Sequence, residues 1–169
     1  MLVFILLTLG VLSRLLVHVP NFTPVVALAL FGGAYLKQRR LALLLPLGLM
    51  MISDLFLGFH QAILFTWGGV ALAALVGVWL RGRRNGINLA AGSLFSALVF
   101  FVVSNFGAWL AMYPHTADGL ARCYLAAIPF FRATVASTLI YTAVLCAGYE
   151  AVARAVRDTR LARVLLPAG

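Results

Sequence analysis

The chain has 169 residues, of which 64% are hydrophobic and 10% are charged, and its mean hydropathy is +1.06. Soluble domains carry about 25% charged residues, so this chain could not cover a surface that faces water. The net charge of +9 would suit nucleic acid, but the basic residues stand in short clusters between apolar runs, as orientation signals in membrane proteins do. The composition predicts one integral-membrane domain over residues 1–169 that contacts the lipid bilayer and does not bind nucleic acid.

Apolar runs along the chain predict six transmembrane helices, because about 20 apolar residues are needed to cross the hydrocarbon core. The run at Met1–Leu12 has no positive region before it and no cleavage site after it, so we expect a retained helix rather than a signal peptide. In chain order, the expected helices cover about 2–17, 24–35, 41–56, 61–80, 87–112 and 129–156. The second is short, so we expect it to be tilted or to span only part of the bilayer. A basic amphipathic tail over about 154–169 follows the membrane part.

Most basic residues lie in two loops and in the tail. They are Lys37, Arg39, Arg40, Arg81, Arg83, Arg84, Arg154, Arg157, Arg160 and Arg163. If six helices alternate in direction, all these residues lie on one side, whereas an odd number of helices would scatter them. The positive-inside rule then places both termini in the cytoplasm. We therefore expect an all-α, multi-pass bundle of six transmembrane helices in a bacterial inner membrane.

Small residues recur at four-residue spacing on two of the expected helices. Gly69, Ala73 and Gly77 form one such stripe, and Ala29 with Gly33 forms another. Small residues let helix backbones approach closely within a membrane. We favour packing within the bundle over a docking face for a partner protein.

Polar side chains gather at the external ends of the expected helices. The candidate ligand-binding residues are Arg14, His18, Asn21, Asp54, His60 and Asn105. A carboxylate inside a membrane helix costs about 2.5 to 3.5 kcal/mol, so Asp54 requires either a bridge to Arg14 or Arg132 or a ligand role in a wet cavity. The Asn105 amide is expected to bond to another helix or to a substrate. The aromatic candidates for interface anchoring or for stacking on a ring-shaped ligand are Trp67, Trp109, Tyr113 and Tyr124.

The sequence contains no pattern that predicts catalysis. The three histidines lack metal-ligand spacing, and there is no nucleophile motif, phosphate loop or dinucleotide fingerprint. Cys123 and Cys146 have no metal or redox spacing and are expected near opposite membrane faces, which argues against a disulfide. We therefore expect no enzymatic activity and no metal site.

Several stretches carry a resemblance that covers most of the chain. They are His18-Val-Pro-Asn21-Phe-Thr-Pro24, Ala27-Leu-Ala-Leu-Phe-Gly32-Gly33-Ala34, Ser53-Asp54-Leu-Phe-Leu-Gly58-Phe-His60, Ser104-Asn105-Phe-Gly107, Cys123-Tyr124 and Ile128-Pro129-Phe130-Phe131. They resemble an uncharacterised family of bacterial six-helix membrane proteins, which is itself similar to the substrate-binding S components of energy-coupling-factor vitamin transporters. The resemblance implies a ligand pocket that opens outward beneath the external loops, with vitamins and related cofactors as the substrate class.

The resemblance also implies an energising ATPase module as a partner. S components typically meet that module through an Ala-x-x-x-Ala face on the first helix. This chain departs from the pattern, because only Thr8, Gly10 and Ser13 offer small side chains there.

The leading hypothesis is a membrane protein that binds or transports a small vitamin-like or cofactor-precursor solute, with its pocket open to the extracytoplasmic side. The alternative is a non-catalytic accessory subunit of a larger membrane complex. A third class, a membrane-embedded metal enzyme, would require the three histidines and Asp54 to converge.

Overall fold

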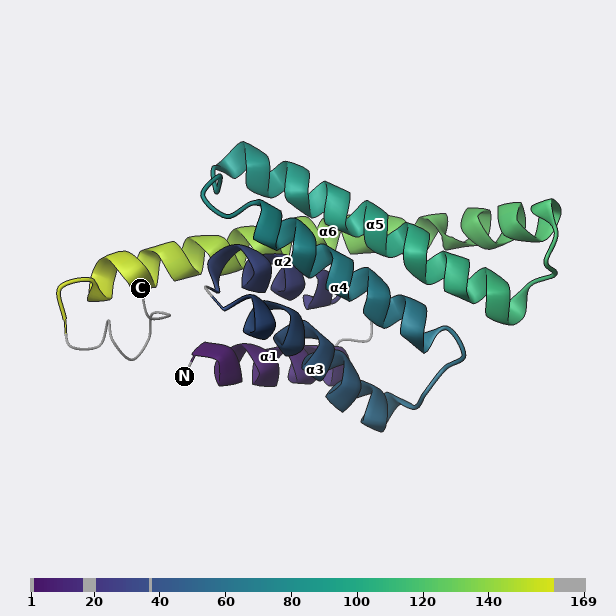
Figure 1. Ribbon diagram of the computed structural model, residues 1–169, viewed down its shortest axis with the longest axis horizontal. Helices are drawn as coiled ribbons and strands as arrows, with labels where there is room; N and C mark the ends of the chain where they lie inside the picture. Colours follow the sequence, from purple (N-terminus) through teal and green to yellow (C-terminus); the bar gives the residue numbers. More distant parts are fainter. Residues whose placement is uncertain (1, 17–20, 37, 160–169) are drawn as a thin grey trace.

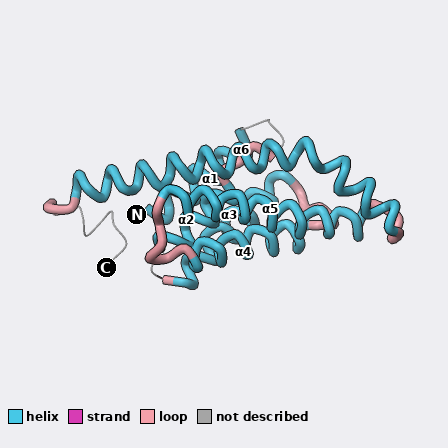
Figure 2. Tube along the Cα trace, turned by 90° about the horizontal axis from the view of Figure 1, so that it is seen from above, coloured by secondary structure: helices cyan, strands magenta, loops and turns pink. Residues whose placement is uncertain are grey.

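The computed structural model describes residues 2–16, 21–36 and 38–159. The described residues form six helices and no strand: α1 (Leu2–Leu16), α2 (Val25–Tyr35), α3 (Arg39–Leu57), α4 (Ile63–Trp79), α5 (Gly86–Met112) and α6 (Ala117–Val156). Consecutive helices run in opposite directions along the long axis, so the start of α1 and the end of α6 lie toward the same end (Figure 1). Seen from above, α6 runs the whole length of the molecule (Figure 2).

Helix length and composition mark the chain as a membrane protein. Within the described residues, the helices α3, α5 and α6 are long and apolar enough to cross a membrane. The 40 residues of α6 extend about 60 Å, which is twice the hydrocarbon core of about 30 Å, so α6 is longer than a single span requires. The 11 residues of α2 extend only about 16 Å, as its short apolar run leads one to expect.

Helix α2 forms the centre of the bundle, and all of its residues are buried. It packs most closely on α4, where a Cβ added to Gly33 would lie 2.8 Å from the Cα of Gly77. A Cβ added to Gly77 would in turn collide with the carbonyl of Leu30. Gly33 and Gly77 therefore let α2 and α4 approach closely, and Gly69 packs on Phe100 of α5, which confirms that these small residues serve packing within the bundle.

Helix α6 begins earlier than the sequence suggested. It was expected to begin at Pro129, but it starts at Ala117 and contains Pro129 in its interior. The side chain of Thr116 caps the new start by accepting a hydrogen bond from the Gly119 N–H at 3.1 Å. Capping and packing along α5 offset the cost of an interior proline, which is about 3 kcal/mol. Cys123 consequently lies on a helix and is buried, not in an external loop.

Both cysteines are free, buried and on α6, so a disulfide between them is excluded by distance. Cys123 and Cys146 are separated by 23 residues of one helix, which corresponds to about 35 Å.

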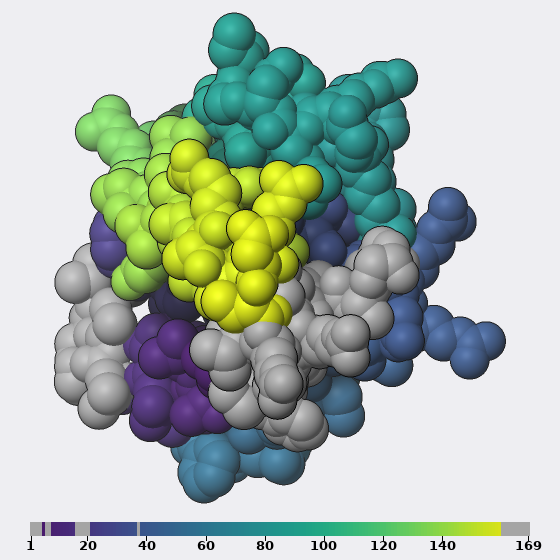
Figure 3. All heavy atoms as spheres, turned by 90° about the vertical axis from the view of Figure 1, so that its left-hand side faces the viewer, coloured from purple at the N-terminus to yellow at the C-terminus, as the bar shows by residue number. Residues whose placement is uncertain are grey.

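The end of the bundle that holds the starts of α1 and α3 and the end of α6 is basic. Figure 3 looks onto this end, and the end of α6 (yellow), the α4–α5 connection (teal) and the start of α3 (blue) all appear in this view. Arg81 donates from Nε to the Gly33 carbonyl at 2.8 Å and from Nη2 to the Leu36 carbonyl at 2.6 Å. Its cation thus stabilises the carboxyl end of α2. Burial, and then the charge of Arg39, lowers the pKa of the Arg81 guanidinium.

Candidate functional site

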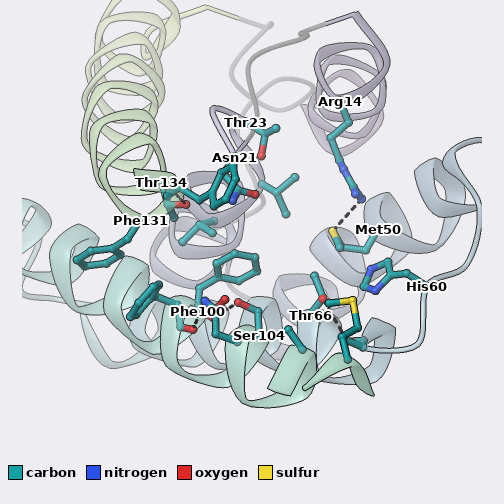
Figure 4. Close-up of a pocket in the computed structure, with 18 residues that line it drawn as sticks. Arg14, Asn21, Thr23, Met50, His60, Thr66, Phe100, Ser104, Phe131 and Thr134 are labelled. Carbon is teal, nitrogen blue, oxygen red and sulfur yellow. Dashed lines mark hydrogen bonds between the residues drawn. The ribbon is translucent and has the colours of Figure 1, made fainter. Parts of the chain in front are cut away.

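A cavity of 440 Å³ lies toward the opposite end of the bundle, and every helix contributes to its wall. Arg14 comes from α1, Met50 from α3 and Thr66 from α4, while α2 contributes its first residues. Figure 4 shows Arg14 reaching from α1 toward Met50 and His60, with side chains of α5 and α6 on the other side. Cavities of about 300 to 1,000 Å³ accommodate small organic ligands.

Arg14 is held in this wall by a buried carboxylate. Its Nη1 lies 3.0 Å from Oδ1 of Asp54 and donates to Oγ of Ser53 at 2.5 Å. The indole Nε1 of Trp67 donates to the other oxygen of Asp54 at 2.8 Å. The side chain of Asp54 is 2% exposed and that of Arg14 is 17% exposed. Asp54 therefore ties α1, α3 and α4 together behind the cavity.

The predicted bridge from Asp54 to either Arg14 or Arg132 is confirmed, and its partner is Arg14. The expected helix over about 129–156 placed Arg132 near its start. Because α6 already begins at Ala117, Arg132 lies within it, with its side chain exposed.

The pairing leaves part of the Arg14 guanidinium available. A guanidinium has five N–H donors, and the contacts of Arg14 within the described residues all use Nη1. Its Nη2 and Nε groups can therefore donate to an oxygen of a bound molecule. Paired N–H groups in this fork suit a carboxylate or two adjacent carbonyl-type oxygens.

The other polar groups of the wall present mainly acceptors. Ser104 Oγ donates to the Phe100 carbonyl, and Asn105 Nδ2 donates to the Phe101 carbonyl, each at 2.7 Å. Thr66 and Thr134 bond in the same way to the carbonyls four residues before them. The oxygens of these side chains remain free to accept from a ligand. The expected bond from Asn105 to another helix is therefore wrong, since its amide bonds to its own helix.

Phenylalanines supply the apolar part of the wall. Phe100 and Phe101 of α5 and Phe130 and Phe131 of α6 all line the cavity, and the rings of Phe101 and Phe131 lie 4.6 Å apart. The sequence pointed instead to a different set of aromatic residues, none of which lines the cavity. Trp67 binds Asp54, and the Tyr124 hydroxyl donates to a backbone carbonyl at 2.7 Å. Two Phe-Phe pairs on neighbouring helices were the signal that could have revealed this wall.

The six candidate ligand residues are distributed as follows. Arg14, Asn21, His60 and Asn105 line the cavity, and Asp54 lies behind it. His18 lies outside the described residues. A ligand-binding role for these side chains stays a prediction. Within the described part of the chain, no three His, Cys, Asp or Glu side chains are grouped so that they could hold a metal ion.

The fold and the cavity define a helical membrane protein with one pocket to which all six helices contribute. The chain belongs to the Family of unknown function (DUF6580), which it matches over residues 1–161. No curated protein and no solved structure matches it.

Proposed function

We propose that this protein binds a small vitamin-like or cofactor-precursor solute at the cavity and takes part in its transport, without catalysing a reaction. The observation that carries the proposal is a cavity of 440 Å³ to which every helix contributes, with an arginine fixed by a buried carboxylate. A purely structural ion pair would not need a phenylalanine-lined space beside it. The wall suits a planar solute that carries a carboxylate or carbonyl and several hydrogen-bond donors. The guanidinium would bind the carboxylate or carbonyl, the acceptor oxygens would bind the donors, and the phenylalanine rings would contact the planar part.

In this proposal the six helices form one bundle in a bacterial inner membrane, with both termini in the cytoplasm and the cavity facing outward. The placement of the basic residues at the end away from the cavity supports this orientation. An energising ATPase module is the proposed partner for transport.

The test is to identify what the protein retains. The wild-type protein is purified in a mild detergent and denatured, and the released small molecules are identified by mass spectrometry. We expect one enriched solute, which is then titrated against the emptied protein. Arg14→Gln should weaken its binding at least tenfold, because a charge-assisted hydrogen bond contributes about 1.5 to 3 kcal/mol.

Arg132→Gln is the matched control, because it makes the same chemical change on an exposed side chain outside the cavity. It should leave solute binding unchanged. Equal binding by the wild type and the Arg14→Gln variant would contradict the proposal. A wild-type protein that retains no solute would favour the accessory-subunit alternative instead.

A further inference from the structure

A second hollow lies on the outer face of the bundle, between α4 and α5, and shares no residue with the cavity described above. Its volume is 740 Å³. One wall is formed by Leu72, Leu75 and Trp79 of α4, which recur at helical spacing on one face. The facing wall is formed by Phe95 and Val99 of α5. We refer to this hollow as the α4–α5 groove.

The α4–α5 groove has the length of one membrane leaflet. On α5 its lining runs from Asn88 to Val99, which corresponds to about 16 Å along the helix axis. This is about half of the hydrocarbon core of about 30 Å. Its walls are also open to the surroundings, since Trp79 is 66% exposed and Phe95 is 55% exposed. A partner helix that crosses the bilayer would require a groove about twice as long.

Only one end of the α4–α5 groove is polar. There the guanidinium of Arg83 lies over the ring of Trp79, 5.7 Å from its centre. The Asn88 amide donates to the Arg83 carbonyl at 2.7 Å and so fixes the connection that carries this arginine. The two ion pairs found among the described residues involve other arginines. Arg83 is thus a cation at the mouth of an apolar groove with no carboxylate bound to it in the described part of the chain.

We propose that the α4–α5 groove binds one acyl chain of an anionic phospholipid, whose phosphate group is recognised by Arg83. The apolar walls suit an acyl chain, and the length of the groove about equals the thickness of the leaflet that holds such a chain. The positive charge of Arg83 at the mouth suits an anionic headgroup. Basic residues near a membrane surface attract anionic lipids by electrostatics. The inference rests on insertion of α5 into the membrane and is independent of any solute in the cavity.

The test uses the purified full-length protein in detergent, with phosphatidylglycerol and phosphatidylcholine of identical acyl chains. Retention of each lipid is measured by native mass spectrometry. We expect preferential retention of phosphatidylglycerol, and Arg83→Gln should weaken that retention about fivefold. Ala91→Phe, which fills the groove from its α5 wall, should weaken retention of both lipids.

Two variants control for changes of charge and size elsewhere. Arg40→Gln removes a charge at the same end of the bundle, and Ala136→Phe adds an aromatic ring on the exposed face of α6. Neither should change lipid retention. Three outcomes would each overturn the proposal. They are equal retention of the two lipids, no effect of Ala91→Phe on retention, and displacement of the lipid by glycerol 3-phosphate alone. A dimer that places a second copy over the groove would also overturn it.

Discussion

Asp54 acts on the cavity through Arg14 and does not line it. Both of its carboxylate oxygens have a nitrogen donor, one from Arg14 and one from Trp67. A buried carboxylate with this set of partners is satisfied without a ligand. If the cavity binds a solute as proposed, Asp54 contributes by fixing the Arg14 guanidinium and is a positioning residue.

Removal of the charge of Asp54 should therefore destabilise the fold. Asp54→Asn leaves the Arg14 cation poorly hydrated and without its carboxylate, and breaking such a pair costs about 3 kcal/mol or more. We expect a clear fall in the thermal unfolding temperature in detergent, measured by circular dichroism. A second change, Arg14→Gln, should restore part of the loss, and a double-mutant cycle gives the size of the coupling.

The chain offers a matched comparison in the pair of Asp118 and Arg122. Its side chains are 70% and 74% exposed, so Asp118→Asn should lower the unfolding temperature far less than Asp54→Asn, although Asp118 lies in the first turn of α6. If Asp54→Asn and Asp118→Asn lowered the unfolding temperature equally, burial of the Asp54 pair would not be the reason for the loss of stability.

At the residue scale, the sequence predicted the charged and amide groups of the site better than its apolar wall. Arg14 and Asp54 stood out because an ionised group within an apolar run is costly without a partner. Phe100 and Phe131 did not stand out, because phenylalanine is common throughout membrane helices and its spacing does not distinguish a cavity from a lipid-facing surface. The partner of Asn105 was also missed, since an amide in a helix can bond to its own backbone as easily as to a neighbour.

Helices α2 and α4 can approach closely because Gly33 and Gly77 have no side chains where the two helices meet. Gly33→Ala should destabilise the protein by about 1 to 3 kcal/mol or more, because its Cβ would overlap the backbone of α4. Gly48→Ala in α3 is the control, because a Cβ there meets nothing within 4 Å. It should be neutral or slightly stabilising, since alanine has the higher helix propensity. Unfolding temperatures of the two variants in one detergent make the comparison, and equal losses would contradict the close packing of α2 on α4.

At the element scale, the apolar runs predicted the order of all six helices and most of their ends. The sequence misplaces the start of α6, because Pro129 is typical of a helix boundary, whereas the cap at Thr116 lies more than three turns earlier. The clue was present, since Thr116 precedes a first turn that contains Asp118. Local capping outweighed the interior proline here because α6 also packs along α5.

The whole molecule has two chemically different ends. The connections before α3 and after α4, together with the end of α6, carry arginines, whereas the other end holds the cavity. The positions of the basic clusters predicted this polarity, because alternate loops of a helical bundle lie on alternate sides. The positions of the basic clusters could not predict the cavity itself. Its volume depends on how far the helices diverge near their ends, and the sequence composition contains no information on that distance.

This polarity makes a prediction about orientation that single cysteines can test. Gln38 lies in the connection before α3, and Ala117 begins α6 at the opposite end, and both are exposed. The native cysteines are only 3% and 6% exposed, so their background labelling by a membrane-impermeant maleimide should be low. In intact spheroplasts, the maleimide should label Ala117→Cys and spare Gln38→Cys, because the proposed orientation places the basic end in the cytoplasm. Lysed membranes provide the control, since both variants should then be labelled. Labelling of Gln38→Cys alone from outside would contradict the proposed orientation. Labelling of both variants from outside would contradict a bundle whose two ends lie on opposite sides of the membrane.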